Sequence, residues 1–224
     1  MSVDARDRKT ADPATLDVWT DPDKERLLTP ATVITFIRTA ASVVVSGFAI
    51  HDESLTLLVV ALAVYWVGDT LDGFVARVGK CETRIGAVLD IMSDRFCAAG
   101  FYLGLAWLHH EYTIPVLIYL AEFMVIDNFL SIAFLAWRIR SPNYFFVIDY
   151  KIWLYSWSKP GKAVNSAIFA VILLLTKMPW LGIVIASALM LYKLYALARL
   201  LRIGLPIPPY DGPPHRAHGQ NATA

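Results

Sequence analysis

The sequence predicts an all-α integral membrane protein, a bundle of six transmembrane helices preceded by an N-terminal cytoplasmic surface helix or arm. Hydrophobic residues make up 57% of the 224 residues and charged residues 17%, against about 45–50% and about 25% in soluble domains. The mean hydropathy is +0.51. Apolar windows of about 20 residues, the length that a helix needs to cross a bilayer, recur along the chain. The length favours one domain.

The apolar windows divide the chain into an arm (1–28), a six-span domain (29–202) and a tail (203–224). The arm is polar throughout and has no apolar run that could be a signal peptide. The tail is rich in Pro, Gly and His and lacks periodic apolar residues, so we expect it to be flexible. The expected spans lie at 31–50, 55–76, 86–108, 113–137, 163–176 and 179–201.

The fifth window, 163–176, is the shortest, and it can span only if its helix begins near Lys159 or tilts little. With six spans, the loops near 51–54, 109–113 and 177–179 lie on one side of the membrane. Of the 20 Lys and Arg residues only Lys177 falls in these loops. The positive-inside rule therefore predicts that both termini and the other loops are cytoplasmic. In a bacterium this would be the inner or plasma membrane.

Net charge and cysteine usage exclude other classes. Lys and Arg (20) nearly balance Asp and Glu (19), so no overall field would attract nucleic acid, and we expect no nucleic-acid partner. The two cysteines, Cys81 and Cys97, have no metal-ligand spacing and are too few for a disulfide framework. Partners must be argued from local sites.

Four aspartates occupy places where a membrane protein tolerates charge poorly. Asp69 and Asp72 lie near the end of the second window, and Asp90 and Asp94 lie near the start of the third. Ionisable residues inside a membrane are functional candidates by default. Spacings of three and four residues place each pair on one helix face, so two adjacent antiparallel helices would bring the four carboxylates together.

Four carboxylates at close range need a cation among them. Oxygen ligands without His or Cys favour a hard cation such as Mg²⁺, Mn²⁺ or Ca²⁺, and four carboxylates could hold two ions, an arrangement suited to displacement at phosphorus. Three small residues, Gly73, Ala76 and Gly86, share these faces and leave room for a ligand. Arg77 supplies a fixed cation for a phosphate.

Two alternatives stay open from the residues alone. The aspartates could pair with nearby arginines and only anchor the helix ends at the interface; these are Arg77, Arg84 and Arg95. Intramembrane acids also mark the paths of cation channels and transporters. Against a transport path, all four acids gather at one end of two helices, and the far halves of these windows are apolar.

The run Asp69-x-x-Asp72-Gly73-x-x-Ala76-Arg77, then eight residues, then Gly86-x-x-x-Asp90-x-x-x-Asp94, resembles the signature of the CDP-alcohol phosphotransferase (CDP-alcohol phosphatidyltransferase) family, with every position filled. The resemblance implies transfer of a phosphatidyl group from CDP-diacylglycerol to an alcohol, with release of CMP, in membrane phospholipid synthesis. It also implies two ions, Mg²⁺ or Mn²⁺, and a homodimer among membrane lipids.

The resemblance also assigns roles to the motif residues. Asp69, Asp72, Asp90 and Asp94 would be metal ligands, and Asp94 would also be the catalytic general base on the acceptor hydroxyl. The residues around the CDP group would be Asp69, Asp72, Gly73, Ala76, Arg77 and Gly86. An aspartate one turn deeper than Asp90 faces the same cavity, as a base there must.

The acceptor alcohol is a small polyol phosphate or a lipid alcohol, and we favour glycerol 3-phosphate. Residues 32–38 resemble the opening helix of the phosphatidylglycerophosphate synthase and cardiolipin synthase branch, and residues 158–165 resemble a Lys-containing segment of it. The chain departs from that branch at Asp90-Ile-Met-Ser-Asp94-Arg95, where Asp-Pro-x-x-Asp-Lys is usual. Phosphatidylglycerol, inositol phosphate and other alcohols remain alternatives. Candidate acceptor-binding residues are Thr32, Arg38, Asp127, Lys159 and Lys162.

Overall fold

The computed structural model describes residues 16–206, except for four side chains, those of Pro22, Lys159, Ser166 and Ala167. Residues 1–15 of the expected arm and 207–224 of the expected tail lie outside the described residues. Between 16 and 206 the chain forms helices and no strand, and one isolated antiparallel bridge joins Trp19 to Ile139. The all-α prediction is confirmed.

Three long helices follow a 3₁₀ turn, η2 (Pro22–Lys24). They are α2 (Pro30–His51), α3 (Leu55–Val78) and α4 (Arg84–Leu108). Each follows a hydroxyl residue in extended conformation whose side chain accepts a backbone N–H of the first turn, which fixes where the helix starts. These caps are Thr29, Ser54 and Thr83.

The second half of the chain contains two helical rods with changes of pitch. The first, 110–136, consists of η3 (His110–Tyr112), α5 (Thr113–Ala121), the π-helix η4 (Glu122–Asp127), α6 (Asn128–Ile132) and η5 (Ala133–Ala136). The second, 159–176, consists of α8 (Lys159–Lys162), the π-helix η7 (Ala163–Ala167) and α9 (Ile168–Thr176). Between them lie η6 (Pro142–Val147) and α7 (Tyr150–Ser156), and α10 (Pro179–Ile203) ends the described fold.

Four helical segments among the described residues are long and apolar enough to cross a membrane: α2, α3, the rod 110–136 and α10. The third expected span is present as α4, but this helix carries charge at Arg84, Asp90, Asp94 and Arg95. The fifth is present with its start at Lys159, one of the two conditions under which it could span. Four of the six expected spans therefore have the length and composition that a membrane crossing requires. Six crossings stay a prediction.

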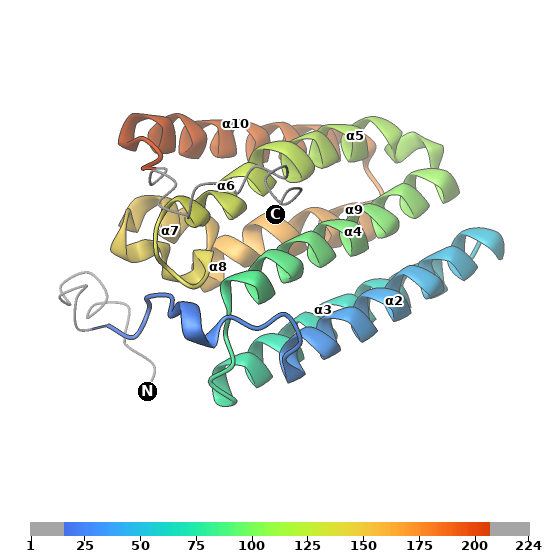
Figure 1. Ribbon diagram of the computed structural model, residues 1–224. Coiled ribbons are helices and arrows are strands. Elements are labelled where there is room, and N and C mark those ends of the chain that lie inside the picture. Colours follow the sequence, from blue (N-terminus) through green and yellow to red (C-terminus); the bar gives the residue numbers. More distant parts are fainter. Residues whose placement is uncertain (1–15, 207–224) are drawn as a thin grey trace, which may run out of the picture.

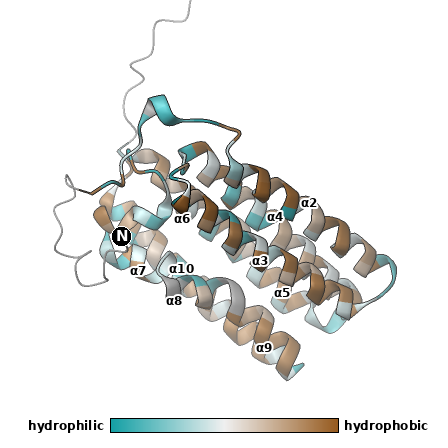
Figure 2. Ribbon diagram, turned by 90° about the horizontal axis from the view of Figure 1, so that it is seen from below, coloured by the Kyte–Doolittle hydropathy of each residue, from teal (hydrophilic) through white to brown (hydrophobic). Residues whose placement is uncertain are grey.

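The helices form an elongated bundle. α2 packs along both α3 and α4, and α5 packs along α10. In Figure 1, α2 and α3 lie along one flank, α5 and α10 along the opposite flank, and α4 between them. The long helices are mostly brown in Figure 2, whereas the chain before α2 carries teal. Large apolar side chains point outward along the bundle, as lipid-facing residues do; they include Phe36, Phe48, Val67, Phe74, Trp107, Leu175 and Leu191.

Two buried clusters hold the bundle together. The first joins α4, α5 and α9 through Tyr102, Tyr119 and Phe169, whose rings lie 4.4–5.5 Å apart. The second lies at the other end, where Phe145 and Trp157 pack with centroids 4.8 Å apart. The second cluster fixes η6 and α7 against the ends of α6 and α10, beside the site described next.

Candidate active site

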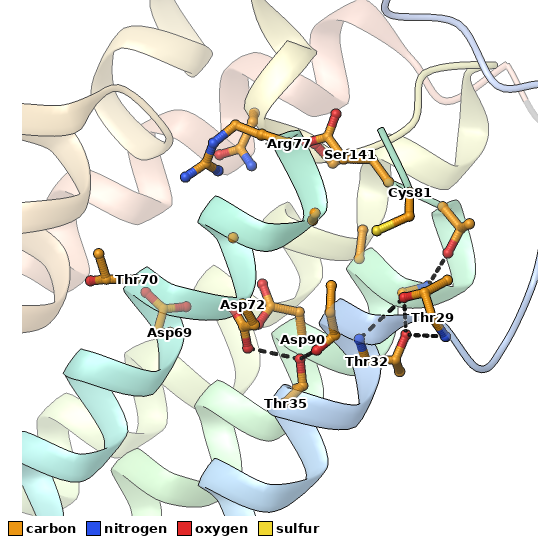
Figure 3. A pocket seen from close by; sticks show the side chains of 18 of the residues that line it. Thr29, Thr32, Thr35, Asp69, Thr70, Asp72, Arg77, Cys81, Asp90 and Ser141 are labelled. Atoms are coloured by element: carbon orange, nitrogen blue, oxygen red, sulfur yellow. Dashed lines mark hydrogen bonds between the residues drawn. The ribbon is translucent and has the colours of Figure 1, made fainter. Parts of the chain in front are cut away.

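A cavity of about 500 Å³ lies where α2 begins, α3 ends and α4 begins. Figure 3 shows its side chains, with Asp69 and Asp72 on one helix and Asp90 on the next. Every residue of the motif lines this cavity except Asp94. We call it the main cavity. Its other lining residues include Thr29, Thr32, Thr35, Thr70, Cys81, Glu82, Thr83, Ser141, Asn143 and Lys162.

Three motif carboxylates meet in the main cavity. One oxygen from each of Asp69, Asp72 and Asp90 lies within 4.8 Å of the others. Asp72 is buried, and the side chains of Asp69 and Asp90 are 44% and 39% exposed, so two of the three open onto the cavity. An all-oxygen donor set of this size fits a hard divalent cation such as Mg²⁺ or Mn²⁺.

The cation that contacts all four motif aspartates is Arg38, on α2. Its Nε donates to Asp72 Oδ2 at 2.7 Å, and its Nη2 donates to Asp90 Oδ1 at 2.6 Å and Asp94 Oδ1 at 2.9 Å. Nη2 also lies 3.8 Å from Asp69 Oδ1. The aspartates therefore pair with Arg38, and not with the nearby arginines that the sequence left open as partners.

The three nearby arginines, which lie in α3 and α4, turn elsewhere. Arg95 Nη2 donates to Asp127 Oδ2 at 2.5 Å, and Arg84 Nη2 donates to the carbonyls of Leu135 and Trp137. Arg77 lines the main cavity and folds back over Gly73, where an added Cβ would lie 3.1 Å from its Nη1. A side chain at this glycine would displace the guanidinium that faces the cavity.

Gly86 lies against the cap of α4. Its N–H donates to Thr83 Oγ1 at 3.0 Å, and a Cβ on Gly86 would lie 2.8 Å from that same oxygen. A side chain here would therefore require the cap hydroxyl or the helix start to shift. The loop before α4 is held by Glu25, whose carboxylate accepts from the backbone N–H groups of Arg84 and Ile85, a favourable place for a negative charge.

A second cavity of about 160 Å³ adjoins the main one, and we call it the side cavity. Asp69, Asp90 and Lys162 line both, so the carboxylate cluster forms part of their common wall. Asp94 lines only the side cavity of the two. Most of the remaining wall is polar or aromatic, with Tyr65, Arg95, Phe123, Asp127, Ser131, Ser141, Asn143, Ser156, Trp157 and Asn165, and Ala87, Ile91 and Pro142 complete it.

Several buried polar atoms of residues that line the side cavity have no hydrogen-bond partner among the described residues. They are Arg95 Nε, Asn165 Oδ1 and Ser141 Oγ. A buried polar atom without a partner costs free energy unless a ligand or water satisfies it. The side cavity therefore suits a small polar molecule.

The predicted acceptor-binding residues do not all line the same cavity. Asp127 lines the side cavity, Lys162 lines both cavities, and Thr32 lines only the main cavity. Arg38 lines neither, because it lies among the aspartates. The side chain of Lys159 lies outside the described residues.

Sequence reasoning missed most of the side cavity. Ser131, Ser156 and Asn165 come from three separate helical segments, and their types carry no signal by themselves. Only Asn165 had a usable clue, since it ends the Lys-containing segment at 158–165 that resembles one branch of the family.

The segment 138–147, which contains η6, closes against the α3–α4 turn. The Tyr144 hydroxyl donates to Glu82 Oε2, and burial together with this hydrogen bond raises the pKa of Tyr144 above its ordinary value. The segment before α2 also joins residues 138–147, since Thr20 N–H donates to the Arg138 carbonyl and Arg140 N–H donates to that of Val18. These contacts fix Ser141 and Asn143 at the edge of both cavities.

Comparison with known families gives one match. The family model described as CDP-alcohol phosphatidyltransferase matches residues 28–198, which is more than half of the chain. Neither a curated protein nor a solved structure matches the chain. The matched region contains all of the motif and both cavities' lining residues.

Proposed function

Because the chain belongs to the CDP-alcohol phosphatidyltransferase family, we propose that it transfers a phosphatidyl group from CDP-diacylglycerol to glycerol 3-phosphate, with release of CMP. Membership makes it a membrane transferase of phospholipid biosynthesis that takes a CDP-linked donor and an alcohol acceptor. It favours this class over the cation channel or transporter considered from the sequence. The donor lipid, the acceptor and a mechanism with two metal ions are the parts that we propose.

The observation that carries the proposal is the common wall of the two cavities. The main cavity, at about 500 Å³, has room for a nucleotide, and the side cavity, at about 160 Å³, has room for a small alcohol. Both reach the carboxylates of Asp69 and Asp90. A phosphorus atom held at these carboxylates would face an acceptor oxygen in the side cavity, and the leaving CMP would lie on the opposite side, as in-line displacement requires.

Asp69, Asp72, Asp90 and Asp94 would hold the metal ions. Two Mg²⁺ or Mn²⁺ ions at this cluster would neutralise the pyrophosphate oxygens of the donor. Arg77, which also lines the main cavity, would bind a donor phosphate. Gly73, Ala76 and Gly86 would let the CDP group approach the backbone of α3 and α4.

Asp94 would act as the general base. It lines the side cavity, where the acceptor hydroxyl would lie, and not the main cavity. As the acceptor oxygen bonds to the phosphorus, its proton would pass to the Asp94 carboxylate, and the bond between phosphorus and the oxygen of CMP would break.

The charges of the side cavity would favour a phosphorylated acceptor once metal ions neutralise the motif aspartates. Among the described residues of its wall, Arg95 and Lys162 are cationic, and Arg95 is already paired with Asp127. Lys162 lines the cavity beside Asp69 and Asp90, so it would neutralise an acceptor phosphate close to the reacting centre. The volume suits a three-carbon polyol phosphate. We further propose that the site and both termini face the cytoplasm and that the protein is a homodimer.

The test is CMP release by the purified full chain from CDP-diacylglycerol, with Mg²⁺ or Mn²⁺. The acceptors compared are glycerol 3-phosphate, phosphatidylglycerol, inositol 1-phosphate, inositol and serine. Metal-dependent release with glycerol 3-phosphate alone is the expected result. Release with another acceptor alone would replace the proposed acceptor, and no release with any would contradict the proposed donor.

A further inference from the structure

We propose that Arg38 is the positioning residue of the carboxylate cluster and that Gly68 provides the space in which it lies. The proposal rests on the metal site of the proposed function but on neither the donor nor the acceptor. Arg38 would act through the aspartates, without touching a substrate. It differs in this from the acceptor-binding role that the sequence suggested.

The guanidinium ties together carboxylates from two helices. Nε contacts one oxygen of Asp72 on α3, and Nη2 contacts one oxygen each of Asp90 and Asp94 on α4. Thr35, one turn before Arg38 on α2, donates to the same Asp72 oxygen at 2.7 Å. Since α2 packs against both α3 and α4, it holds the two halves of the motif in register.

Arg38 lies behind the carboxylates as seen from the cavities. It is 3% exposed and lines neither the main nor the side cavity, whereas its partners line one or both. The hydrogen bonds from Arg38 use one oxygen each of Asp72, Asp90 and Asp94, which leaves the second oxygen of each carboxylate for a ligand in a cavity. Outer partners of this kind fix the orientation of metal-ligating carboxylates.

The geometry requires arginine. Nε and Nη2 are two separate donor atoms of one planar group, so they reach α3 and α4 at the same time, whereas a lysine ammonium presents its donors from a single atom. Nη1 of Arg38 has no hydrogen-bond partner among the described residues. The fork formed by Nε and Nη2 therefore accounts for the hydrogen bonds of this buried side chain.

Gly68 is the residue that makes room for Arg38. An added Cβ on Gly68 would lie 2.5 Å from Arg38 Cβ and 2.7 Å from its Cδ, distances at which the arginine stem must shift. The Tyr65 ring, with its centroid 5.5 Å from Arg38 Cζ, lies against the same side chain. A methyl group at Gly68 would thus move Arg38 off the carboxylates without changing any charge.

The experiment measures Mn²⁺ binding to the detergent-solubilised full chain by electron paramagnetic resonance, with neither substrate present. The variants are Arg38→Lys and Gly68→Ala. The matched controls are Gly100→Ala, where a Cβ would meet Ser46 only at 3.8–3.9 Å, and Gly47→Ala, where it would meet nothing within 4 Å. We expect Mn²⁺ affinity to fall by about tenfold or more in both variants and to stay unchanged in both controls.

The other outcomes contradict the proposal. Unchanged Mn²⁺ affinity in Arg38→Lys would show that the fork does not orient the ligands, and tighter binding would show that the guanidinium competes with the ions. If Arg38→Lys does not fold, Arg38 has a structural role and the proposal is wrong. If only Gly68→Ala does not fold, the Mn²⁺ affinity of Arg38→Lys decides the question. If the unchanged protein does not bind Mn²⁺, the proposal falls.

The outcome is separable from that of the proposed function. The unchanged protein could bind Mn²⁺, and the two variants could bind it more weakly, even though the unchanged protein releases no CMP. That result would support the role of Arg38 and contradict the proposed reaction.

Discussion

Lys193, in the middle of α10, donates a hydrogen bond to Asp127 in the π-helix η4, and both side chains are buried in the bundle. Asp127 accepts a second charged hydrogen bond, from Arg95 Nη2 on α4. Ser131 and Ser156 complete the contacts of the two cations. One carboxylate of η4 therefore joins α4 and α10 in the wall of the side cavity.

Asp127→Asn is expected to destabilise the fold strongly. It leaves Arg95 and Lys193 buried without a carboxylate, and removal of one member of a buried ion pair costs about 3–5 kcal/mol. The measurement is unfolding of the detergent-solubilised protein in increasing denaturant. The double variant Asp127→Asn with Lys193→Met should recover part of the loss, because one unpaired charge is removed. A loss below about 1 kcal/mol in the single variant would be incompatible with this ion pairing.

The sequence predicted which acids would meet but not the cation between them. Spacing of three and four residues places Asp69 with Asp72 and Asp90 with Asp94, and three of these four form the cluster in the structure. Arg38 is more than 30 residues from either pair, so its approach depends on how α2 packs. Arg95 follows Asp94 directly, and one residue turns a helix by about 100°, which points it away to Asp127.

The changes of helical pitch were also beyond the sequence pattern. The fourth and fifth windows read as plain apolar helices, but the structure has π-helices at Glu122–Asp127 and Ala163–Ala167. Each contains a polar residue that lines the side cavity, Asp127 in one and Asn165 in the other. A π-helix arises from the balance of tertiary contacts and is common at functional sites, so apolar periodicity does not reveal it.

Asp94→Asn should abolish most of the turnover while Mn²⁺ still binds. The amide cannot accept the proton of the acceptor hydroxyl, and loss of a general base lowers the rate by about 10²–10⁴-fold. Asp69, Asp72 and Asp90 still converge in the main cavity, so metal binding persists. CMP release and Mn²⁺ binding are measured side by side, with Ser93→Ala, the adjacent residue on α4, as control. Near-normal turnover would remove Asp94 as the base.

Lys162→Gln should weaken binding of the acceptor more than it slows the reaction itself. A hydrogen bond to a charged group contributes about 1.5–3 kcal/mol, so the KM for glycerol 3-phosphate should rise by about tenfold or more. Steady-state CMP release at saturating CDP-diacylglycerol gives KM and kcat. Lys151→Gln is the control, because this exposed lysine of α7 lines neither cavity. An unchanged KM would place the acceptor phosphate elsewhere.

Asp149→Asn should make the protein less stable, by an amount that depends on pH. Asp149 caps α7 through Ile152 N–H and is paired with Arg199 at 2.7 Å on α10. Burial raises the pKa of Asp149, but the hydrogen bonds from Arg199 and the backbone outweigh it and hold the pKa below its ordinary value of 3.8. Asparagine also caps helices well, so this variant removes the charge and keeps the cap.

A lowered pKa means that the folded protein releases this proton more readily than the unfolded chain does. The stabilisation by Asp149 is therefore fully present above about pH 4 and is lost as the pH falls through the lowered folded value. Melting temperatures of the unchanged protein and of Asp149→Asn should differ by a constant amount between pH 5 and pH 7 and converge on further acidification. Asp21→Asn, in an exposed pair with Lys24, should change the melting temperature little at any pH. A difference that persists or widens in acid would show that the Arg199 pair does not stabilise the junction of α7 with α10.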